Sequence, residues 1–118
     1  MLNARMLFAW CLQITLGSKL DGEAVAHVVG LMQHAPPGTQ AMLLDGSGVR
    51  DYDIPTLQAA LPDLSYAQQR GISRIILVTT EAFASMVAAE IEAASGAKTS
   101  VFESVSDAER WLRAGCPA

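Results

Sequence analysis

Apolar and polar residues alternate along the first part of the chain. From Met6 to Leu16 every second residue is large and apolar, and the residues between them form a second, more mixed face. Side chains alternate with a period of two along a β-strand. We therefore predict one long strand within residues 1–16.

Helical periodicity follows at three later places. After a Gly-Ser turn, Asp21 stands where it can cap a helix whose apolar residues recur at i, i+3, i+4 and i+7. Thr80 can cap another helix, which Gly96 ends. Ser106 and Glu109 have the spacing of a capping box and predict the start of a last helix.

A further predicted helix contains two prolines. Pro55 stands in its first turn, where proline is tolerated, and the helix extends towards Gln69. Pro62 lies in the helix interior, where it removes one hydrogen bond and clashes with the preceding turn. We therefore predict a kink, or two short helices, near Leu61.

Short apolar runs between the helices predict three more strands, at residues 42–44, 75–78 and 99–102. The run at 75–78 is apolar on both faces, as expected for a strand inside a sheet that helices cover on each side. Strands that alternate with helices form parallel sheets. The chain is therefore predicted to be a single small layered α/β domain over residues 1–118, with a mostly parallel four- to five-stranded sheet and about four helices.

Composition and charge narrow the function classes. The chain has 118 residues, 51% of them apolar, and a net charge of −4 without a cluster of lysine or arginine. These features argue against a nucleic-acid partner and against an anionic membrane surface. No apolar run reaches the roughly 18 residues that a membrane span requires. The short apolar run after Arg5 resembles a signal peptide, but its alternation favours a strand.

Two cysteines bear on the cellular compartment. Cys11 lies in the apolar run near the start of the chain, and Cys116 lies among the last residues. Their spacing suits neither a metal knuckle nor a redox pair. We expect both thiols to be reduced and the protein to be cytoplasmic.

Three stretches of the chain together resemble the STAS superfamily. Residues 14–21 are similar to the family's strand, glycine turn and acid-capped helix, and residues 43–49 are similar to its central strand and loop. Residues 101–104 and 107–112 are similar to its closing strand and helix. The chain thus resembles the sulfate-transporter and anti-sigma-factor-antagonist domains, and the SpoIIAA-like bacterial proteins in particular.

The resemblance has implications for regulation. Switching members of the family carry a phosphorylatable serine directly after an aspartate at the start of the second helix. Asp53 best matches that aspartate, but Ile54 follows it; if Asp51 is the match instead, Tyr52 follows. The resemblance therefore implies a signalling domain that binds a protein without the phosphoswitch. The family usually begins with a strand pair, whereas residues 1–16 leave room for only one long strand.

The candidate binding site follows the second predicted strand. The carboxyl ends of parallel strands face the crevice in which α/β domains bind their ligands. We predict that the loop over residues 46–53 and the helix start after it form a docking surface for a protein partner. The candidate residues are Asp45, Ser47, Asp51, Tyr52, Asp53 and Thr56.

These residues allow other chemistry as well. The carboxylates of Asp45, Asp51 and Asp53 could hold magnesium, although a solvated acidic loop is the simpler interpretation. Ser47 and Thr56 are candidate phosphoacceptors. A phospho-accepting Asp45, as in response-regulator receivers, would need an acidic pair after the first strand and a lysine near the end of the last one, and the sequence has neither.

Two function classes stay open beside the regulatory one. A small apolar ligand or lipid could bind in a pocket lined by the aromatic residues Phe8, Trp10, Phe83 and Trp111, although core packing is the simpler interpretation. An enzyme would need an acid–base pair, and the sequence contains no complete catalytic set. We therefore predict a non-enzymatic protein without a cofactor or metal. Whether the chain forms a homodimer is left open.

Overall fold

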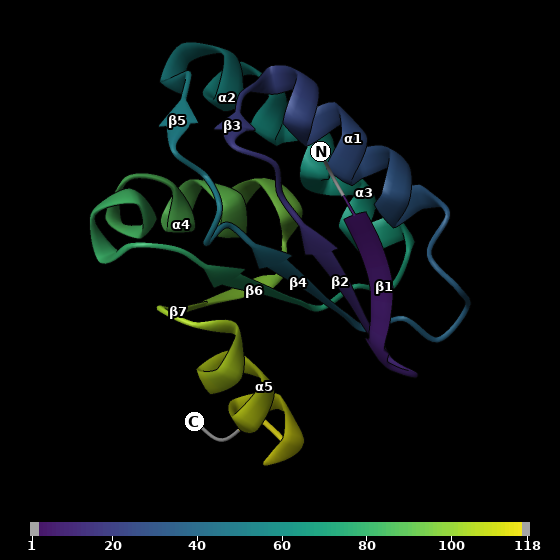
Figure 1. Ribbon diagram of the computed structural model, residues 1–118. Coiled ribbons are helices and arrows are strands. Elements are labelled where there is room, and N and C mark those ends of the chain that lie inside the picture. The colour runs from purple at the N-terminus through teal and green to yellow at the C-terminus, as the bar shows by residue number, and fades with distance from the viewer. Residues whose placement is uncertain (1–2, 117–118) are drawn as a thin grey trace.

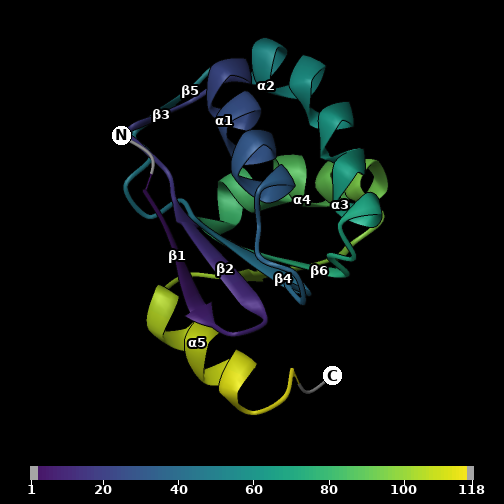
Figure 2. The same ribbon diagram turned by 90° about the vertical axis from the view of Figure 1, so that its right-hand side faces the viewer.

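A five-stranded sheet separates two unequal layers of helices (Figure 1). Helices α1 to α4 cover one face of the sheet and α5 alone covers the other, a division that Figure 2 shows from a perpendicular direction. The computed structural model describes residues 3–116. In chain order the elements are β1 (Asn3–Phe8), β2 (Cys11–Thr15), β3 (Lys19–Leu20), α1 (Gly22–Gln33), β4 (Ala41–Asp45), β5 (Asp51–Tyr52), α2 (Ile54–Ala60), the 3-10 helix η1 (Leu61–Ser65), α3 (Tyr66–Gln69), β6 (Arg74–Val78), α4 (Glu81–Ser95), β7 (Lys98–Phe102) and α5 (Val105–Arg113).

The strands of the main sheet are arranged in the order β1-β2-β4-β6-β7. β1 is antiparallel to β2, and all other neighbouring pairs are parallel. β6 has a neighbour on each side, which confirms the interior position predicted for residues 75–78. The predicted α/β class with a mostly parallel sheet is therefore confirmed. Beyond the carboxyl ends of β2 and β4, β3 and β5 form a separate parallel pair.

The prediction of one long strand within residues 1–16 is wrong. The chain forms a hairpin in which Ala9 and Trp10 join β1 to β2. The apolar alternation continues through this turn, so the pattern carries no sign of it. A bulge after Met6 changes the face: Met6 packs under the α1–α4 layer, whereas Phe8 stacks on Trp10 on the α5 side, with ring centroids 5.4 Å apart. The chain therefore begins with the strand pair that is usual in the STAS superfamily.

Side-chain caps begin the two longest helices as predicted. The Asp21 carboxylate accepts a hydrogen bond from the Ala24 N–H at the start of α1 (3.0 Å). The Thr80 hydroxyl accepts one from the Phe83 N–H at the start of α4 (3.3 Å). α4 ends at Gly96, whose φ of 71° lies in the left-handed region that glycine adopts without strain.

The last helix begins two residues before the predicted capping box. Ser104, and not Ser106, caps α5: its hydroxyl accepts a hydrogen bond from the Asp107 N–H (3.1 Å). Ser104 follows β7 almost directly and keeps an extended backbone, with φ −140° and ψ 153°. That conformation is the one a helix cap requires, so the helix starts at Val105 and Ser106 lies in its first turn.

The helix with two prolines is interrupted as predicted. α2 ends at Ala60, and the chain continues through the 3-10 helix η1, which contains Pro62, into the short helix α3. Leu57, Leu61 and Leu64 of this segment are buried in the hydrophobic cluster between the sheet and the α1–α4 layer.

Among residues 3–116 there is no helix with the length and apolar character that crossing a membrane requires.

The two faces of the sheet pack into two separate hydrophobic clusters. Ile75 and Leu77 of β6 belong to the cluster under α1–α4, whereas Ile76 and Val78 belong to the cluster under α5. Alternate side chains of a strand point to opposite faces, so each interior strand contributes to both clusters. On the α5 side, the ring of the half-buried Trp111 packs against Phe102.

Candidate functional site

The candidate site begins where β4 ends. Asp45 is the last residue of β4 and is buried, and its Oδ1 accepts hydrogen bonds from the Ser47 N–H (3.0 Å) and from the Ser47 hydroxyl (2.6 Å). An aspartate that accepts bonds from the residue two positions later closes a turn. Asp45 therefore shapes the loop, and Ser47 lies exposed on it.

Gly46 ties this loop to the neighbouring strand. Its N–H donates a hydrogen bond to the carbonyl oxygen of Val78 at the end of β6 (2.8 Å). A Cβ atom at position 46 would lie 2.9 Å from the same oxygen, closer than such atoms approach in proteins. A side chain here would push β4 and β6 apart, so the loop can lie against β6 only because residue 46 is glycine.

The second half of the loop pairs with the segment that follows β2. Lys19 lies beside Asp51 and Leu20 beside Tyr52 in the parallel β3–β5 pair. The Tyr52 ring packs on Phe83 of α4, with centroids 4.7 Å apart, and the residue is still 42% exposed. Strand pairing and the ring contact together hold Tyr52 at the surface in one orientation.

Asp53 and Thr56 build the start of α2. The Asp53 carboxylate caps the helix by accepting a hydrogen bond from the Thr56 N–H (3.4 Å). The Thr56 hydroxyl donates to the Asp53 carbonyl oxygen (3.2 Å) and accepts a hydrogen bond from the Gly22 N–H (3.3 Å). These bonds join the first turn of α2 to the first turn of α1, so both side chains already have local partners.

The three carboxylates considered for magnesium have separate surroundings. Asp45 faces its own loop, Asp51 is exposed on β5, and Asp53 caps α2. Within residues 3–116, no three histidine, cysteine, aspartate or glutamate side chains gather closely enough to hold a metal ion.

A hollow of about 440 Å³ opens at this edge of the sheet, and we call it the carboxyl-edge hollow. Of the predicted site residues, it brings together only Ser47 and Tyr52. Its other walls come from the ends of β6 and β7 and the start of α4, which the sequence analysis missed even though neighbouring parallel strands end at one edge. The lining residues are Gly46, Ser47, Val49, Tyr52, Thr79, Thr80, Glu81, Phe83 and Glu103.

The carboxyl-edge hollow lies in acidic surroundings. Glu81 and Glu103 line it, and Asp51 is exposed on the adjacent strand β5. Lys19, the register neighbour of Asp51, lies 3.9 Å from the Asp21 carboxylate. Charges within about 10 Å of one another are incompletely screened at physiological salt. The lining of the hollow therefore combines two carboxylates with hydroxyl groups and one exposed aromatic ring.

An apolar cavity of about 40 Å³ lies between the sheet and the α1–α4 layer. Every residue that lines it is apolar: Leu16, Leu20, Val25, Val28, Leu44, Leu57, Leu61, Leu64, Leu77, Phe83, Val87 and Ile91. A single water occupies roughly 30 Å³ in the liquid. The cavity as it stands therefore has room for a group about the size of one water or methyl.

The four aromatic residues considered for an apolar pocket do not share one. Phe83 lies in the cluster under α1–α4, whereas Phe8, Trp10 and Trp111 lie on the α5 side of the sheet. The sheet itself separates the two groups. The pocket that the sequence suggested is therefore wrong, because strand order rather than residue type decides which aromatic rings meet.

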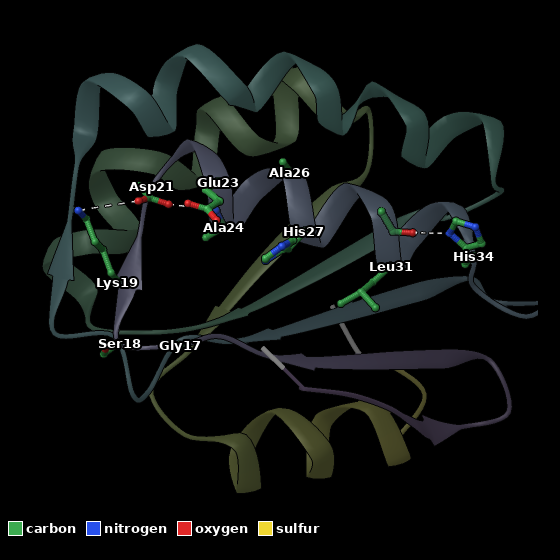
Figure 3. Close-up of a pocket in the computed structure, with 11 residues that line it drawn as sticks. Gly17, Ser18, Lys19, Asp21, Glu23, Ala24, Ala26, His27, Leu31 and His34 are labelled. Atoms are coloured by element: carbon green, nitrogen blue, oxygen red, sulfur yellow. Dashed lines mark hydrogen bonds and ion pairs between the residues drawn. The ribbon is translucent and has the colours of Figure 1, made fainter. Parts of the chain in front are cut away.

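A groove of about 870 Å³ follows the exposed side of α1 (Figure 3). Leu31 projects from the helix toward the strands, and His27 lies one turn before it. His34 turns back to its own helix, where its Nδ1 lies 2.8 Å from the Gly30 carbonyl oxygen. Both histidines are exposed, and neither forms a salt bridge or hydrogen bond with a carboxylate in the described part of the chain.

Both cysteines are free, as the sequence predicts. Cys11 is completely buried on the α5 side of the sheet, and Cys116 packs half-buried against the same cluster. Burial, together with the charge of the nearby Cys116 thiolate, raises the pKa of the Cys11 thiol from 9.0 to about 11. Cys11 is therefore protonated and a poor nucleophile at neutral pH.

Neither a protein-family model nor a curated protein sequence matches the chain. Its structure is similar to the crystal structure of an uncharacterized protein from the DUF3478 family, with a SpoIIAA-like fold, from Shewanella loihica PV-4; the TM-score is 0.62 at 16% sequence identity, over 95% of this chain and 92% of that one. The chain has a SpoIIAA-like fold. The resemblance to SpoIIAA-like domains is thereby confirmed for the fold.

Proposed function

We propose that this SpoIIAA-like domain is a non-enzymatic regulatory module that binds a protein partner at the carboxyl-edge hollow. The observation that carries the proposal is the orientation of Tyr52. Its backbone is fixed by the pairing of β5 with β3, and its ring packs on Phe83, yet 42% of the residue is exposed beside the hollow. Tyrosine, tryptophan and arginine dominate the binding energy of protein interfaces. A ring that is already held loses little conformational entropy when a partner covers it.

The charge around the hollow favours a partner with basic groups. Glu81 and Glu103 line the hollow, and Asp51 lies on the strand that carries Tyr52. Complementary charge at an interface speeds association and rejects partners of the wrong sign. Basic side chains around an apolar contact for Tyr52 would complement this surface.

The surroundings of Asp53 support a module without the family phosphoswitch. Asp53 caps α2, which supports its match, rather than that of Asp51, to the aspartate that switching members of the STAS superfamily carry at the start of the second helix. The next residue is Ile54, which is half-buried and packs against the core under α1–α4. Its side chain has no hydroxyl to accept phosphate. Control of this module would therefore depend on the amount of partner, or on another site, and not on a serine after Asp53.

The chemistry of the hollow favours binding over catalysis. Its polar walls consist of hydroxyl groups and carboxylates: Ser47, Thr79, Thr80, Glu81 and Glu103. The residues described as lining it include no histidine, lysine or cysteine, the side chains that most often activate or replace a hydroxyl nucleophile. The Ser47 hydroxyl is bonded to Asp45, which uses the same oxygen to close the turn.

The apolar cavity under α1–α4 supports a second candidate, a module for a small apolar ligand. Its walls are entirely apolar, and dry cavities of that kind accept apolar guests. Its volume of about 40 Å³ is far below that of a typical ligand pocket, roughly 300 Å³ or more. A lipid chain would enter only if helices moved apart, so this candidate ranks second.

The test of the proposal compares two tyrosines of similar exposure. Tyr52 is 42% exposed beside the hollow, and Tyr66 is 39% exposed at the start of α3. Partners are first recovered from the native host with the tagged parent chain and identified by mass spectrometry. The parent, Tyr52→Ala and Tyr66→Ala chains are then titrated against the purified partner by calorimetry.

We expect Tyr52→Ala to weaken the complex by about tenfold to a hundredfold, as loss of a central aromatic does. Tyr66→Ala should leave the affinity unchanged, and both variants should melt close to the parent. Equal affinities for the parent and for Tyr52→Ala would refute the docking assignment. Saturable uptake of an uncharged apolar fluorescent probe by a chain that binds no protein would instead favour the apolar cavity.

A further inference from the structure

A second polar cleft lies at the opposite edge of the sheet, where the strands begin. It has a volume of about 300 Å³, and Trp10 of the hairpin turn forms part of its wall. Gln40 and Ser73, which precede β4 and β6, and Cys116 after α5 form other parts. We call it the amino-edge cleft. The sequence analysis did not predict this cleft, because its residues come from four separate parts of the chain.

Arg74 supplies the charge of the amino-edge cleft. It is the first residue of β6, it is half-buried, and its guanidinium carbon lies 5.7 Å from the centroid of the Trp111 ring. Stacking on an aromatic ring restrains a guanidinium but leaves its N–H groups, which lie in the guanidinium plane, able to donate. Lys98, the register neighbour of Arg74 on β7, places a second cation beside it on the same face of the sheet.

Neither cation is neutralised within the described part of the chain. The ion pairs among residues 3–116 are Lys19–Asp21, Arg110–Asp107 and Arg113–Glu109, and they include neither Arg74 nor Lys98. The residues described as lining the cleft include no aspartate or glutamate. The chain has a net charge of −4, yet Arg74 lines this cleft, Lys98 lies beside Arg74 on the next strand, and the described lining residues include no carboxylate. The cleft therefore differs in charge from the acidic opposite edge.

We propose that the amino-edge cleft binds a small organic acid, with its carboxylate on the Arg74 guanidinium and its apolar part against the Trp10 indole. A guanidinium and a carboxylate match in geometry and form two parallel hydrogen bonds. The Ser73 hydroxyl donates to the Gln40 carbonyl oxygen (3.4 Å), and the Gln40 side-chain amide at the cleft wall offers a further donor. The indole wall favours an acid with a hydrocarbon chain or ring over a bare inorganic anion, since it offers apolar contact.

The two tryptophans of the chain provide a built-in probe for this site. Trp10 lines the cleft, and Trp111 lies under the Arg74 guanidinium. These are the only tryptophans in the sequence, so all tryptophan fluorescence arises at or next to the cleft. An acid that binds Arg74 should change the intensity or wavelength of that emission with saturation.

The experiment titrates the full chain with hexanoate, acetate, inorganic phosphate and chloride at constant ionic strength and pH 7. We expect hexanoate to saturate with a dissociation constant on the order of 1 mM, tighter than acetate and phosphate, with chloride inert. Arg74→Gln should weaken hexanoate binding by about tenfold or more, because the charged pair is lost. Arg50→Gln removes the same charge from an exposed site near the opposite edge and should change the affinity by less than about twofold.

Two additional variants keep the test decisive. If Arg74→Gln does not fold, Lys98→Gln alters an exposed residue and should still weaken hexanoate binding about two- to threefold. Tyr52→Ala should bind hexanoate like the parent, which separates this site from protein docking at the other edge. The inference is overturned if hexanoate gives no saturable change, if chloride reproduces its effect, or if binding survives unchanged in Arg74→Gln or, should that variant not fold, in Lys98→Gln.

Discussion

The two faces of the sheet are covered by helical layers of different extent. Under α1–α4, strand residues such as Met42 and Ile75 are completely buried beneath several helical segments. On the α5 side, a small buried group that includes Leu43 and Ile76 is surrounded by half-buried side chains, among them Trp111. One face is thus sealed by a continuous helical layer, and the other is covered by one short helix.

The difference between the faces separates stability from accessible chemistry. Burial of apolar area is the main source of folding free energy, so the α1–α4 side should contribute most to stability. The thinner α5 side leaves Trp10 and Arg74 within reach of solvent, together with the half-buried Cys116. The organic-acid site that we infer lies on this thinner side.

Substitution of two adjacent isoleucines tests most directly whether the two faces contribute differently to stability. Ile75 and Ile76 are neighbours on β6, both are 0% exposed, and they point to opposite faces. We expect Ile75→Ala to lower the free energy of unfolding by about 4 kcal/mol and Ile76→Ala by about 2–3 kcal/mol, because the cost depends on how far neighbours collapse into the space. The single helix α5 can move inward more easily than the joined helices of the other layer. Urea unfolding of both variants measures the difference, and a larger loss for Ile76→Ala would contradict it.

A smaller effect tests how α5 is attached. Ser104 caps α5, so Ser104→Ala should lower the free energy of unfolding by about 1 kcal/mol, whereas Ser106→Ala should change it by only a few tenths. Thr80→Ala removes the corresponding cap from α4 and should cost about as much as Ser104→Ala. Thermal unfolding of the three variants makes the comparison. If Ser106→Ala proved the costlier serine change, the helix would begin where the sequence pattern first suggested.

The smallest expected effect is the contribution of the Cys11 thiol to the pH dependence of stability, which is zero at neutral pH. Its pKa is raised from 9.0 to about 11 in the folded protein, so between these values the unfolded chain has lost a proton that the folded chain keeps. Stability should therefore be unaffected by this group below pH 9, fall as the pH rises through that window, and level off above it. Chemical unfolding of the parent and of Cys11→Ala at several pH values isolates this contribution. Identical pH dependence of the two proteins would show that Cys11 is not shielded by the α5 side.

Much of the fold was predictable because its signals are local. Asp21, Thr80 and Gly96 interact with backbone groups a few residues away. The structure has a helix end at each of these three predicted positions. The turn at Ala9 and Trp10 was missed because apolar alternation runs through it without a break. Ser106 was predicted because its spacing to Glu109 is that of a capping box, and only the end of β7 shows that Ser104 is the cap.

The candidate site was predictable in part, for the same reason. Asp45 and Ser47 are two residues apart, and the hydrogen bonds between them form a local turn at the end of β4. The sequence places both residues in the loop because the apolar run of the strand ends at Asp45. The contact of Tyr52 with Phe83 spans two different elements and depends on where α4 lies relative to β5. No period or cap in the sequence encodes that distance.

By itself, the sequence determined the α/β class, the interior strand β6, the caps of α1 and α4 and the break near Leu61. Only the tertiary structure decided which aromatic rings meet, that Arg74 faces Trp111, and that Ser47 and Tyr52 share a hollow with Glu81. The physical reason is the distance along the chain over which each interaction acts. Capping and periodicity are interactions within about one helical turn or strand pair. Sites form where the strand order brings together residues that are distant along the chain, and that order is set by the packing of the whole domain.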